Sequence, residues 1–428
     1  MDKLVVTGGK TLEGTVAVSG AKNAVLPLLA ATLLTDEPCG IERVPDLRDV
    51  NTMIRMMETL GVAVERRADG SIETRPEAGP GAGDTTVAPY ELVKTMRASI
   101  TVLGPLLAKR GEARVSFPGG CVFGPRPIDL HLQGLRALGA EIDVEAGYIE
   151  ARGKLRGAEM YLGGPCGSTV TGTANVLMAA VLAEGRTVID GAACEPEVTD
   201  LARFLVKMGA SIEGIGSPRL TIEGVRELHG ASHRVIGDRI EAGTFLVAGP
   251  LTGGDVTVTG VEPRRLRSVL EKMREIGIEI IEGDDFVRAR STGVLKSTEI
   301  VTLPFPGFPT DLQAQFMTLL SIADGISIVT EKIYPERFMH VAELHRMRAK
   351  IRKEGPNAIV IGTDRLSGAP VMASDLRASA ALVLAGLVAD GVTEIRRVYH
   401  IDRGYERIEE KLQGLGATVV RAKDSDGP

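Results

Sequence analysis

The 428-residue chain has no tryptophan, only nine phenylalanines and six tyrosines, and few cysteines and histidines. The six histidines form no cluster, and His340 and His345 lack the HExxH arrangement, so we expect no metal site. The four cysteines lie far apart without a CxxC pair, which indicates reduced thiols in a cytosolic protein. They are Cys39, Cys121, Cys166 and Cys194.

An excess of positive charge is also missing. Fifty Lys and Arg stand against 56 Asp and Glu, a formal net charge of −6. Because nucleic-acid binders usually carry a basic domain or stripe, this balance disfavours a nucleic-acid partner. It leaves room for a local positive cluster that binds a small anionic substrate.

Several familiar motifs and segments are absent from the sequence. No GxxxxGK[ST] loop, strand-GxGxxG-helix unit or GxSxG elbow is present. The first residues hold no apolar signal region, so we expect no signal peptide and a cytoplasmic location. The longest uncharged run, 163–183, is broken by Gly, Pro and polar residues, and predicts a loop leading into a buried helix rather than a membrane span.

Glycine is abundant, at 51 of 428 residues, and part of it is periodic. Amphipathic stretches that end in a glycine recur along the chain, with the signature repeated at intervals of 78, 70, 68, 71 and 68 residues. Six units of about 71 residues would fill the chain. The repeated position is occupied by Gly61, Gly139, Gly209, Gly277, Arg348 and Gly416.

Each unit combines two kinds of helix. Apolar residues at helical spacing, then Gly, then alternating apolar residues, are typical of a surface helix with a glycine cap that leads into a strand. Earlier in each unit stands a small-residue, apolar segment such as KNAVLPLLAATLL, which predicts a buried helix. We therefore predict an α/β fold of two domains with three units each, with buried helices inside and sheets outside. The polar segment 66–84 is predicted to be a turn or surface loop.

The segment 117–132, FPGGCVFGPRPIDLHL, is rich in Gly and Pro and should form neither helix nor central strand. It carries Cys121 close to Arg126. A thiol on such a loop near an arginine is typical of a reactive, low-pKa cysteine, which could act as nucleophile or proton donor. A small buried thiol is the equally weighted alternative.

Charged residues recur where the apolar helices begin. Taken singly, Lys22 is explained as a solvated lysine at a helix start, and Asp311 and Asp375 as N-cap residues. If the two halves of the chain face each other, these helix starts converge, and their cations would form an anion site with one carboxylate as general base. The charged residues are Lys22, Arg97, Asp311, Asp375, Arg377 and Arg403, and the polar Asn23 follows Lys22.

These residues lie in blocks that resemble the enolpyruvyl transferase family, in its UDP-N-acetylglucosamine 1-carboxyvinyltransferase branch. The blocks are SGAKNA, PGGCVFGPRPIDLHL, DRIEAGTF, FPTDLQAQF, ERFMHVAEL and DLRASAALVLAG, and the resemblance runs practically end to end. It implies an inverted α/β barrel-like fold whose domains are 22–235, with the Cys121 loop, and 1–21 plus 236–428, with the active site in the cleft between them. It implies no cofactor, no membrane association and no obligate protein partner.

The implied reaction moves the enolpyruvyl group of phosphoenolpyruvate to the 3′-hydroxyl of UDP-N-acetylglucosamine through a tetrahedral intermediate and releases phosphate. This is the first committed step of peptidoglycan precursor synthesis, and thus serves cell wall formation, cell shape and division. In the family the loop cysteine, here Cys121, is the acid, forms an adduct with phosphoenolpyruvate and is alkylated by fosfomycin. Asp311 matches the base, and Lys22, Arg126 and Arg403 match groups that hold phosphate and carboxylate.

The resemblance also implies further substrate contacts. Residues matching nucleotide-sugar contacts are Asn23, Arg97, Pro127, Ile128, Asp129, Leu130 and Ile333, and polar residues around the cleft are Arg337, Asp375 and Arg377. The chain departs from the family where a Lys-x-Ser-Val-Gly-type stretch touches the diphosphate or uracil. That departure leaves the contacts of Gly163, Gly164, Pro165 and Cys166 open, although backbone amides there could bind phosphate.

Three other functions are compatible with parts of this sequence. A 3-phosphoshikimate 1-carboxyvinyltransferase has the same fold and donor, but does not use a loop cysteine such as Cys121. A non-catalytic paralogue that binds UDP-sugar and regulates the pathway is disfavoured because the charged set and the cysteine are all present. A nucleic-acid 3′-end enzyme of related architecture is disfavoured by the acidic balance.

Overall fold

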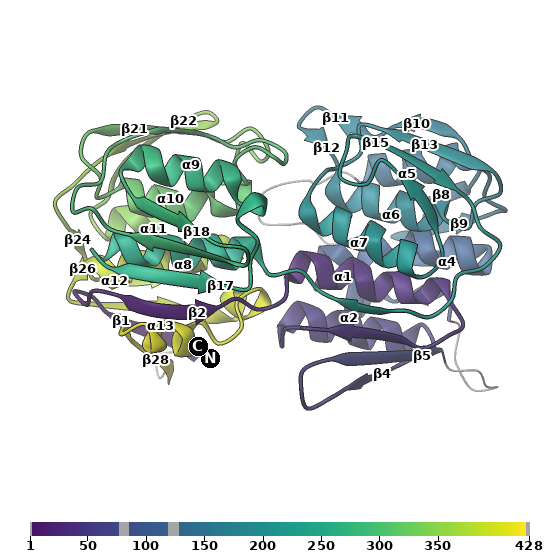
Figure 1. Ribbon diagram of the computed structural model, residues 1–428, viewed down its shortest axis with the longest axis horizontal. Coiled ribbons are helices and arrows are strands. Elements are labelled where there is room, and N and C mark those ends of the chain that lie inside the picture. The colour runs from purple at the N-terminus through teal and green to yellow at the C-terminus, as the bar shows by residue number, and fades with distance from the viewer. Residues whose placement is uncertain (1, 77–84, 119–127, 425–428) are drawn as a thin grey trace. The chain divides into compact units, whose positions relative to one another are not determined.

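We describe a computed structural model of the chain, which covers residues 2–76, 85–118 and 128–424. The chain divides into two compact units (Figure 1). Met1–Ser19 and Gly237–Pro428 form one, here called the two-segment unit, and Gly20–Ile236 forms the other, the one-segment unit. Each has its own hydrophobic core.

Among the described residues, six sheets have four strands each and share one pattern. One edge strand runs parallel to its neighbour, and the remaining pairs are antiparallel. The one-segment unit holds β16 (Ser232–Arg234)-β3 (Cys39–Glu42)-β5 (Ile72–Pro76)-β4 (Val62–Arg66), β6 (Val87–Ala88)-β7 (Glu112–Ser116)-β9 (Tyr148–Arg152)-β8 (Glu141–Glu145), and β10 (Glu159–Tyr161)-β13 (Arg186–Asp190)-β15 (Arg219–Glu223)-β14 (Ser211–Glu213).

The two-segment unit repeats the same pattern three times. Its sheets are β2 (Glu13–Ala17)-β17 (Asp255–Thr259)-β19 (Phe286–Arg290)-β18 (Glu279–Glu282), β20 (Glu299–Val301)-β21 (Ile326–Thr330)-β23 (Asn357–Ile361)-β22 (Lys350–Glu354), and β25 (Pro370–Met372)-β27 (Val392–Arg396)-β1 (Asp2–Thr7)-β28 (Thr418–Lys423). Small two-stranded pairs are β11 (Gly163–Gly164) with β12 (Gly167–Ser168), and β24 (Leu366–Ser367) with β26 (Ala389–Asp390).

The two helix types recur with the sheets. The six buried helices of the described chain are α1 (Lys22–Ala31), α4 (Leu103–Arg110), α6 (Val170–Ala180), α8 (Arg239–Leu251), α10 (Gln313–Leu320) and α12 (Leu376–Val388). The six amphipathic helices are α2 (Arg48–Thr59), α5 (Asp129–Ala137), α7 (Pro196–Lys207), α9 (Arg267–Ile276), α11 (His340–Arg346) and α13 (Ile408–Gly414). A single-turn helix, α3 (Tyr90–Val93), stands outside this alternation.

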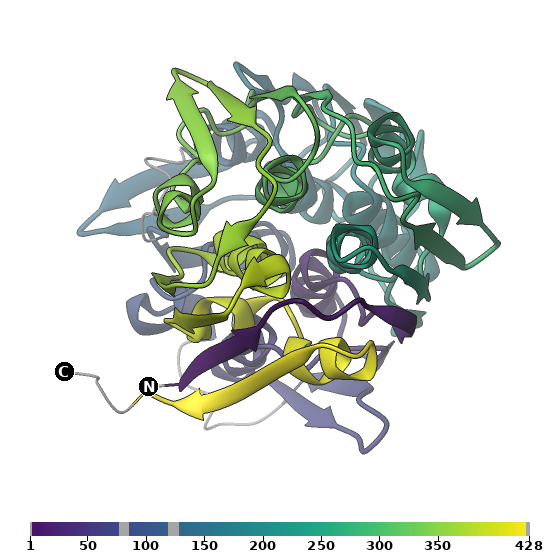
Figure 2. The same cartoon turned by 90° about the vertical axis from the view of Figure 1, so that its left-hand side faces the viewer.

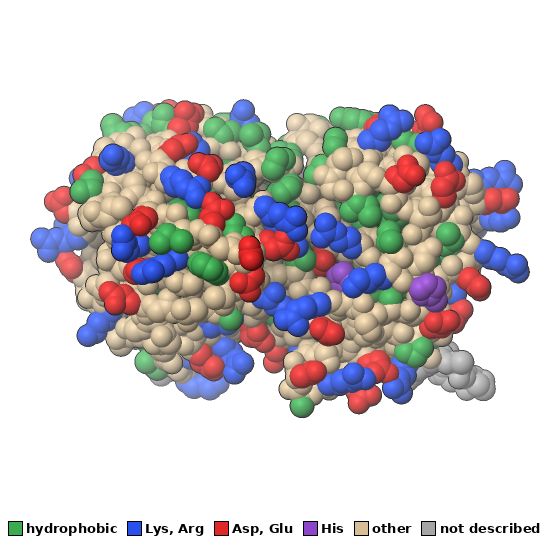
Figure 3. All heavy atoms as spheres, in the orientation of Figure 1, with side chains coloured by type: hydrophobic (Ala, Val, Ile, Leu, Met, Phe, Trp, Pro, Cys, Tyr) green, Lys and Arg blue, Asp and Glu red, His purple; other side chains and the backbone are tan. Residues whose placement is uncertain are grey.

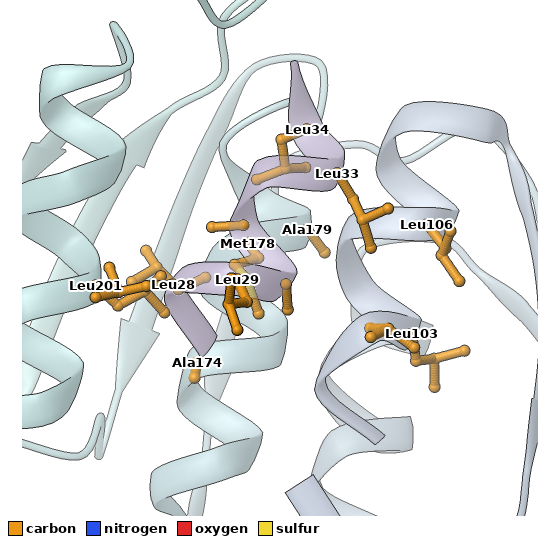
Figure 4. Packing of buried hydrophobic residues seen from close by; sticks show 14 of the residues in the cluster. Leu28, Leu29, Leu33, Leu34, Leu103, Leu106, Ala174, Met178, Ala179 and Leu201 are labelled. Carbon is orange, nitrogen blue, oxygen red and sulfur yellow. The ribbon is translucent and has the colours of Figure 1, made fainter. Parts of the chain in front are cut away.

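The buried helices form the centre of each unit. In the two-segment unit α8, α10 and α12 contact one another, and Figure 2 shows them nearly end-on with the strands around them. In the one-segment unit α6 contacts both α1 and α4, and Figure 4 shows the interlocking side chains, among them Leu28, Leu103 and Met178. Small and aliphatic side chains fill most of both cores, in keeping with the low aromatic content of the chain.

The repeated glycine closes the amphipathic helices. Gly277 has φ 99°, its N–H donates to the carbonyl of Arg274 at 2.9 Å, and the N–H of Ile278 donates to Met273 at 3.0 Å. This is a Schellman end, which needs a left-handed residue. Gly139, Gly209 and Gly416 have the same pair of hydrogen bonds, and so does Arg348, whose φ is 70°.

Each of the two connections between the units follows a strand that pairs within the unit the chain is leaving. β2, which precedes the crossing to α1, pairs in parallel with β17 of the two-segment unit. β16, which precedes the return to α8, pairs in parallel with β3 of the one-segment unit. The N-terminal β1 lies between β27 and β28, so it completes the last sheet of the chain.

Two local predictions need correction. Residues 66–84 are not all loop, because Ile72–Pro76 form β5 with Ile72 and Thr74 buried; residues 77–84 lie outside the described part. Likewise, residues 129–132 of the segment predicted to be loop form the first turn of α5, with Leu132 packed in the core. In both cases only a few residues face the core, and the polar residues between them make the sequence resemble a loop.

The outer surface mixes charges of both signs, as Figure 3 shows for one face. Many are ion pairs between neighbouring strands, such as Arg288 with Asp255 and Arg290 with Glu279. Exposed pairs of this kind contribute little to stability. Among the described residues, no helix has both the length and the apolar character to span a bilayer.

Candidate active site

Lys22 opens α1 of the one-segment unit. Its side chain is buried, and Nζ lies 2.6 Å from Oδ2 of Asp49, which is buried in the first turn of α2. Removing either partner of such a pair would leave an uncompensated buried charge. Asn23, the next residue, is exposed. The ion pair therefore fixes an ammonium group at the start of a buried helix, where the helix dipole also favours anions.

Three of the predicted sugar contacts begin α5. Ile128 is buried, Asp129 is exposed and Leu130 is half-buried. Arg97 is the first residue of the 3-10 helix η2 (Arg97–Val102) and is half-buried. Cys121, Arg126 and Pro127 lie outside the described residues, so their predicted roles stay predictions.

The start of α5 is held by a buried network that the sequence did not reveal. Nδ2 of Asn175 contacts Nδ1 of His131 at 3.1 Å, and Nε2 of His131 contacts Oγ1 of Thr171 at 3.1 Å. Burial and, to a smaller extent, the nearby charge of Arg97 together lower the pKa of His131 to about 3. Since the ring is neutral and Nδ1 accepts from the amide, Nε2 carries the proton and donates to Thr171. Oδ1 of Asn175 accepts from the N–H of Gly104 at 2.6 Å.

The segment that departs from the family pattern forms a small hairpin. Gly163 and Gly164 lie on β11, and Pro165 and Cys166 are exposed in its turn. A Cβ on Gly164 would lie 3.1 Å from Cδ1 of Leu130, so the hairpin lies against the start of α5. This places two of the predicted contact segments side by side within one unit.

Asp311 of the two-segment unit lies in the 3-10 helix η4 (Thr310–Leu312), just before α10. Its Oδ1 lies 2.8 Å from Nη2 of Arg337, and its Oδ2 lies 3.0 Å from Nη2 of Arg377. The side chains of both arginines are buried, whereas that of Asp311 is 26% exposed. The structure thus brings together three residues that the sequence analysis had named separately.

Two opposing effects act on the Asp311 carboxyl. Burial raises its pKa, but the guanidinium groups of Arg377 and Arg337 outweigh burial and hold the pKa well below its usual range. The pKa of Arg377 is correspondingly raised: burial lowers it, and Asp311 more than compensates. The carboxylate is therefore ionised at neutral pH and can accept hydrogen bonds from a substrate hydroxyl.

Asp375 is the N-cap of α12, which is the structural role that its position at a helix start indicated. It accepts hydrogen bonds from the N–H groups of Arg377 at 2.8 Å and Ala378 at 3.1 Å at the start of α12. The cap fixes the first turn from which Arg377 reaches Asp311. Structural capping and site formation are thus two parts of the same arrangement.

The remaining predicted residues of this unit are half-buried. Ile333 lies in the turn after β21. Arg403 ends the 3-10 helix η5 (Val398–Arg403). Its neighbour Asp402 accepts hydrogen bonds from Arg421 at 2.7 and 3.2 Å. In the ranges 2–76, 85–118 and 128–424, no group of three or more His, Cys, Asp or Glu side chains could hold a metal ion.

The sequence model of the family described as EPSP synthase (3-phosphoshikimate 1-carboxyvinyltransferase) matches residues 6–412. The chain belongs to the EPSP synthase family. Two curated relatives of this family member are each named UDP-N-acetylglucosamine 1-carboxyvinyltransferase. The one from Magnetococcus marinus is 54% identical over 425 residues, and the one from Methylacidiphilum infernorum is 53% identical over 422 residues. Both alignments cover 98% of this chain and 99% of the relative.

Solved structures agree with this membership of the EPSP synthase family. The enolpyruvyl transferase NikO from Streptomyces tendae has a TM-score of 0.88 at 25% identity, covering 99% of both chains. EPSP synthase from Acinetobacter baumannii has a TM-score of 0.77 at 18% identity, covering 99% of this chain and 100% of its own, which is a likeness of fold. The predicted α/β fold of six repeated units is confirmed.

Sequence reasoning about this EPSP synthase family member missed the residues that hold the named ones in place. Asp49 pairs with Lys22 across 27 positions of sequence, and Asn175 meets His131 across 44. The sequence shows each of these charged and polar residues, but their spacing follows no helical or strand period that would predict which ones meet. The pairs become evident only when separate helices pack together.

Proposed function

We propose that this protein transfers the enolpyruvyl group of phosphoenolpyruvate to the 3′-hydroxyl of UDP-N-acetylglucosamine, with release of phosphate. The observation that carries the proposal is the identity of 53–54% over nearly the whole chain to two relatives of that name. The family description alone would also admit shikimate 3-phosphate as acceptor, but the EPSP synthase structure is only 18% identical.

In the proposed mechanism, residues of both units act on one substrate pair. Cys121 protonates the methylene carbon of phosphoenolpyruvate, and the sugar 3′-oxygen adds to the neighbouring carbon, giving a tetrahedral intermediate. Asp311 accepts the proton of the 3′-hydroxyl as that oxygen bonds to carbon, because the hydroxyl then becomes acidic enough for a carboxylate of low pKa to take its proton. The bond from the central carbon to phosphate then breaks while a base removes a proton from the methyl carbon, so that a carbon–carbon double bond forms and the product is the enol ether of the nucleotide sugar. Lys22, Arg126 and Arg403 hold the phosphate and carboxylate charges.

The nucleotide sugar is proposed to lie along the start of α5 and the β11–β12 hairpin. The contact between Leu130 and the hairpin supports this arrangement, since it puts both segments on one surface. Proposed contacts are Asn23, Arg97, Pro127, Ile128, Asp129, Leu130, Gly163, Gly164, Pro165, Cys166, Ile333, Arg337, Asp375 and Arg377. We further propose a cytoplasmic protein of peptidoglycan precursor synthesis, and hence of cell shape and division, that fosfomycin inhibits.

The acceptor can be tested directly. Phosphate release from phosphoenolpyruvate is measured with UDP-N-acetylglucosamine and, separately, with shikimate 3-phosphate. We expect release only with the nucleotide sugar. Release only with shikimate 3-phosphate would establish the alternative activity, and no release with either would favour a UDP-sugar-binding regulator.

The role of the loop cysteine needs a matched control. Cys121→Ala should lower turnover by about 100-fold or more, since a general acid contributes roughly 10²–10⁴-fold. Cys39→Ala should leave turnover unchanged, because Cys39 is buried in the core and burial raises the pKa of its thiol. Equal turnover of the two variants would refute the acid role. Mass spectrometry after fosfomycin treatment should find the adduct on Cys121 rather than on the exposed Cys166.

A further inference from the structure

Glu331, which follows β21, is a fully buried carboxylate that none of the predicted roles includes. Its Oε1 accepts from Oγ1 of Thr302 at 2.7 Å and from the N–H groups of Ile333 and Tyr334 at 2.9 Å each. Its Oε2 accepts from Oγ1 of Thr310 at 2.9 Å. A buried charge is costly unless hydrogen bonds satisfy it, and four neutral donors do so here.

Three of these bonds hold the turn after β21. The N–H groups of Ile333 and Tyr334 both point to Oε1, so the backbone of this turn is fixed around the carboxylate. Thr302, which directly follows β20, links the turn to that strand of the same sheet, because its hydroxyl also accepts from the N–H of Lys332 at 3.0 Å. Ile333, proposed above to touch the nucleotide sugar, is thereby held in position.

The fourth bond leads to Asp311. Oγ1 of Thr310 donates to Glu331, and it accepts from Nη1 of Arg337 at 2.9 Å. The direction is unambiguous, because a guanidinium only donates and a carboxylate only accepts. Arg337 then places Nη2 at 2.8 Å from Oδ1 of Asp311. The chain of contacts therefore runs from Asp311 through Arg337 and Thr310 to Glu331.

We propose that Thr310 and Glu331 are positioning residues for the enolpyruvyl transfer, which hold Arg337 in the orientation that aims the Asp311 carboxylate. The inference rests on the proposed function. A guanidinium held by a single carboxylate can swing about that contact, whereas a second contact to Thr310 fixes its plane. The free lone pairs of Asp311 then keep a set direction toward the substrate hydroxyl, and such alignment is worth up to about 100-fold in rate.

The test removes the hydroxyl without changing the shape. Thr310→Val keeps the volume but neither accepts from Arg337 nor donates to Glu331, and Thr310→Ser keeps both bonds. We measure kcat and KM for phosphoenolpyruvate and UDP-N-acetylglucosamine, together with thermal unfolding. Thr310→Val should lose about 10–100-fold in kcat with smaller changes in KM. Thr310→Ser should recover kcat to within about twofold. Thr292→Val, at an exposed threonine of the same unit that loses a hydrogen bond to the carbonyl of Gly277, should keep the wild-type kcat.

A second variant changes Glu331, at the other end of the chain of contacts from Asp311 through Arg337 and Thr310, which is here called the relay. The carbonyl of Glu331→Gln can still accept at Oε1, so the turn keeps its three bonds. Its amide would donate toward Thr310, which then accepts from two sides while its own proton has no acceptor. We expect Glu331→Gln to lower kcat in the same direction as Thr310→Val while folding at 25 °C.

The outcomes separate the two proposals. An active wild type with unchanged kcat in Thr310→Val would overturn the relay alone. A loss in Thr310→Ser as large as in Thr310→Val would also overturn it, since packing rather than hydrogen bonding would then be responsible. A wild type that releases no phosphate with this substrate pair would overturn the function, and the relay with it.

Discussion

Asp311 illustrates how neighbouring residues define a functional side chain. The sequence placed Asp311 and Arg377 at the starts of apolar helices, and both positions could be predicted because a helix start has a local signature. Their contact could not be predicted, since it joins positions 66 apart in sequence. Local sequence signatures predict which residues lie at the start of a helix. Which side chain each of them contacts depends on how the helices of the whole unit pack.

The paired arginines make Asp311 a stabilising group as well as a site residue. A carboxyl whose pKa is lowered in the folded state stabilises that state above its unfolded pKa, about 3.9. This contribution is lost as the pH falls further, toward the folded pKa. We therefore expect Asp311→Asn to lower the free energy of unfolding at pH 7 by roughly 2 kcal/mol, because it leaves two buried guanidinium groups without their anion. The difference from the wild type should shrink below about pH 4.

Urea unfolding at pH 7 and between pH 3 and 4 measures this difference. Asp284→Asn, at an exposed aspartate of the same unit, is the control and should match the wild type at both pH values. A difference that stays constant from pH 7 to 3 would contradict the charge-based explanation.

At the scale of elements, the repeat was the most informative part of the sequence. Glycine spacing identified the helix ends, because the left-handed residue of a Schellman end strongly favours glycine. The strand β5 was missed because its inward face shows only Ile72 and Thr74 among polar residues. A two-residue pattern of that kind is too short to be distinguished from a loop.

Arg348 occupies a glycine position with φ 70° and an exposed side chain. A side chain in the left-handed region costs about 1 kcal/mol or more. Arg348→Gly should therefore raise the free energy of unfolding by about 1 kcal/mol, and thermal or urea unfolding would show it. The reverse change, Gly277→Ala at φ 99°, should lower it by a similar amount. Destabilisation by Arg348→Gly would mean that the arginine side chain makes stabilising contacts that outweigh its backbone strain.

At the scale of the whole molecule, one unit is built from a continuous stretch of sequence and the other from two separate stretches. The three four-stranded sheets of the one-segment unit use only residues of 20–236. The two-segment unit takes β1 and β2 from the N-terminus, and without them two of its sheets lose a strand. Length suggested the number of domains, but the return of the chain to the unit that contains its N-terminal strands could be expected only from the resemblance.

A fragment of residues 20–236 should fold cooperatively by itself, as judged by circular dichroism and a single thermal transition. A fragment of residues 237–428 should not, because β27 and β28 lose the strand between them. Appending residues 1–19 through a short linker after residue 428 should restore folding, since Asp2 pairs with Lys423. A well-folded 237–428 fragment would show that the N-terminal strands are dispensable.

The place of β1 also bears on the order in which a ribosome can finish the molecule. Residues 8–391 separate β1 from its partners β27 and β28, so β1 is synthesised well before either of them. At a synthesis rate of about 5–20 residues per second, the nascent strand waits for tens of seconds with its hydrogen-bonding edges and apolar side chains unpaired. Meanwhile residues 20–236 can emerge and complete their own sheets. During translation, the N-terminal strand therefore stays unpaired for longer than the strands that pair within residues 20–236.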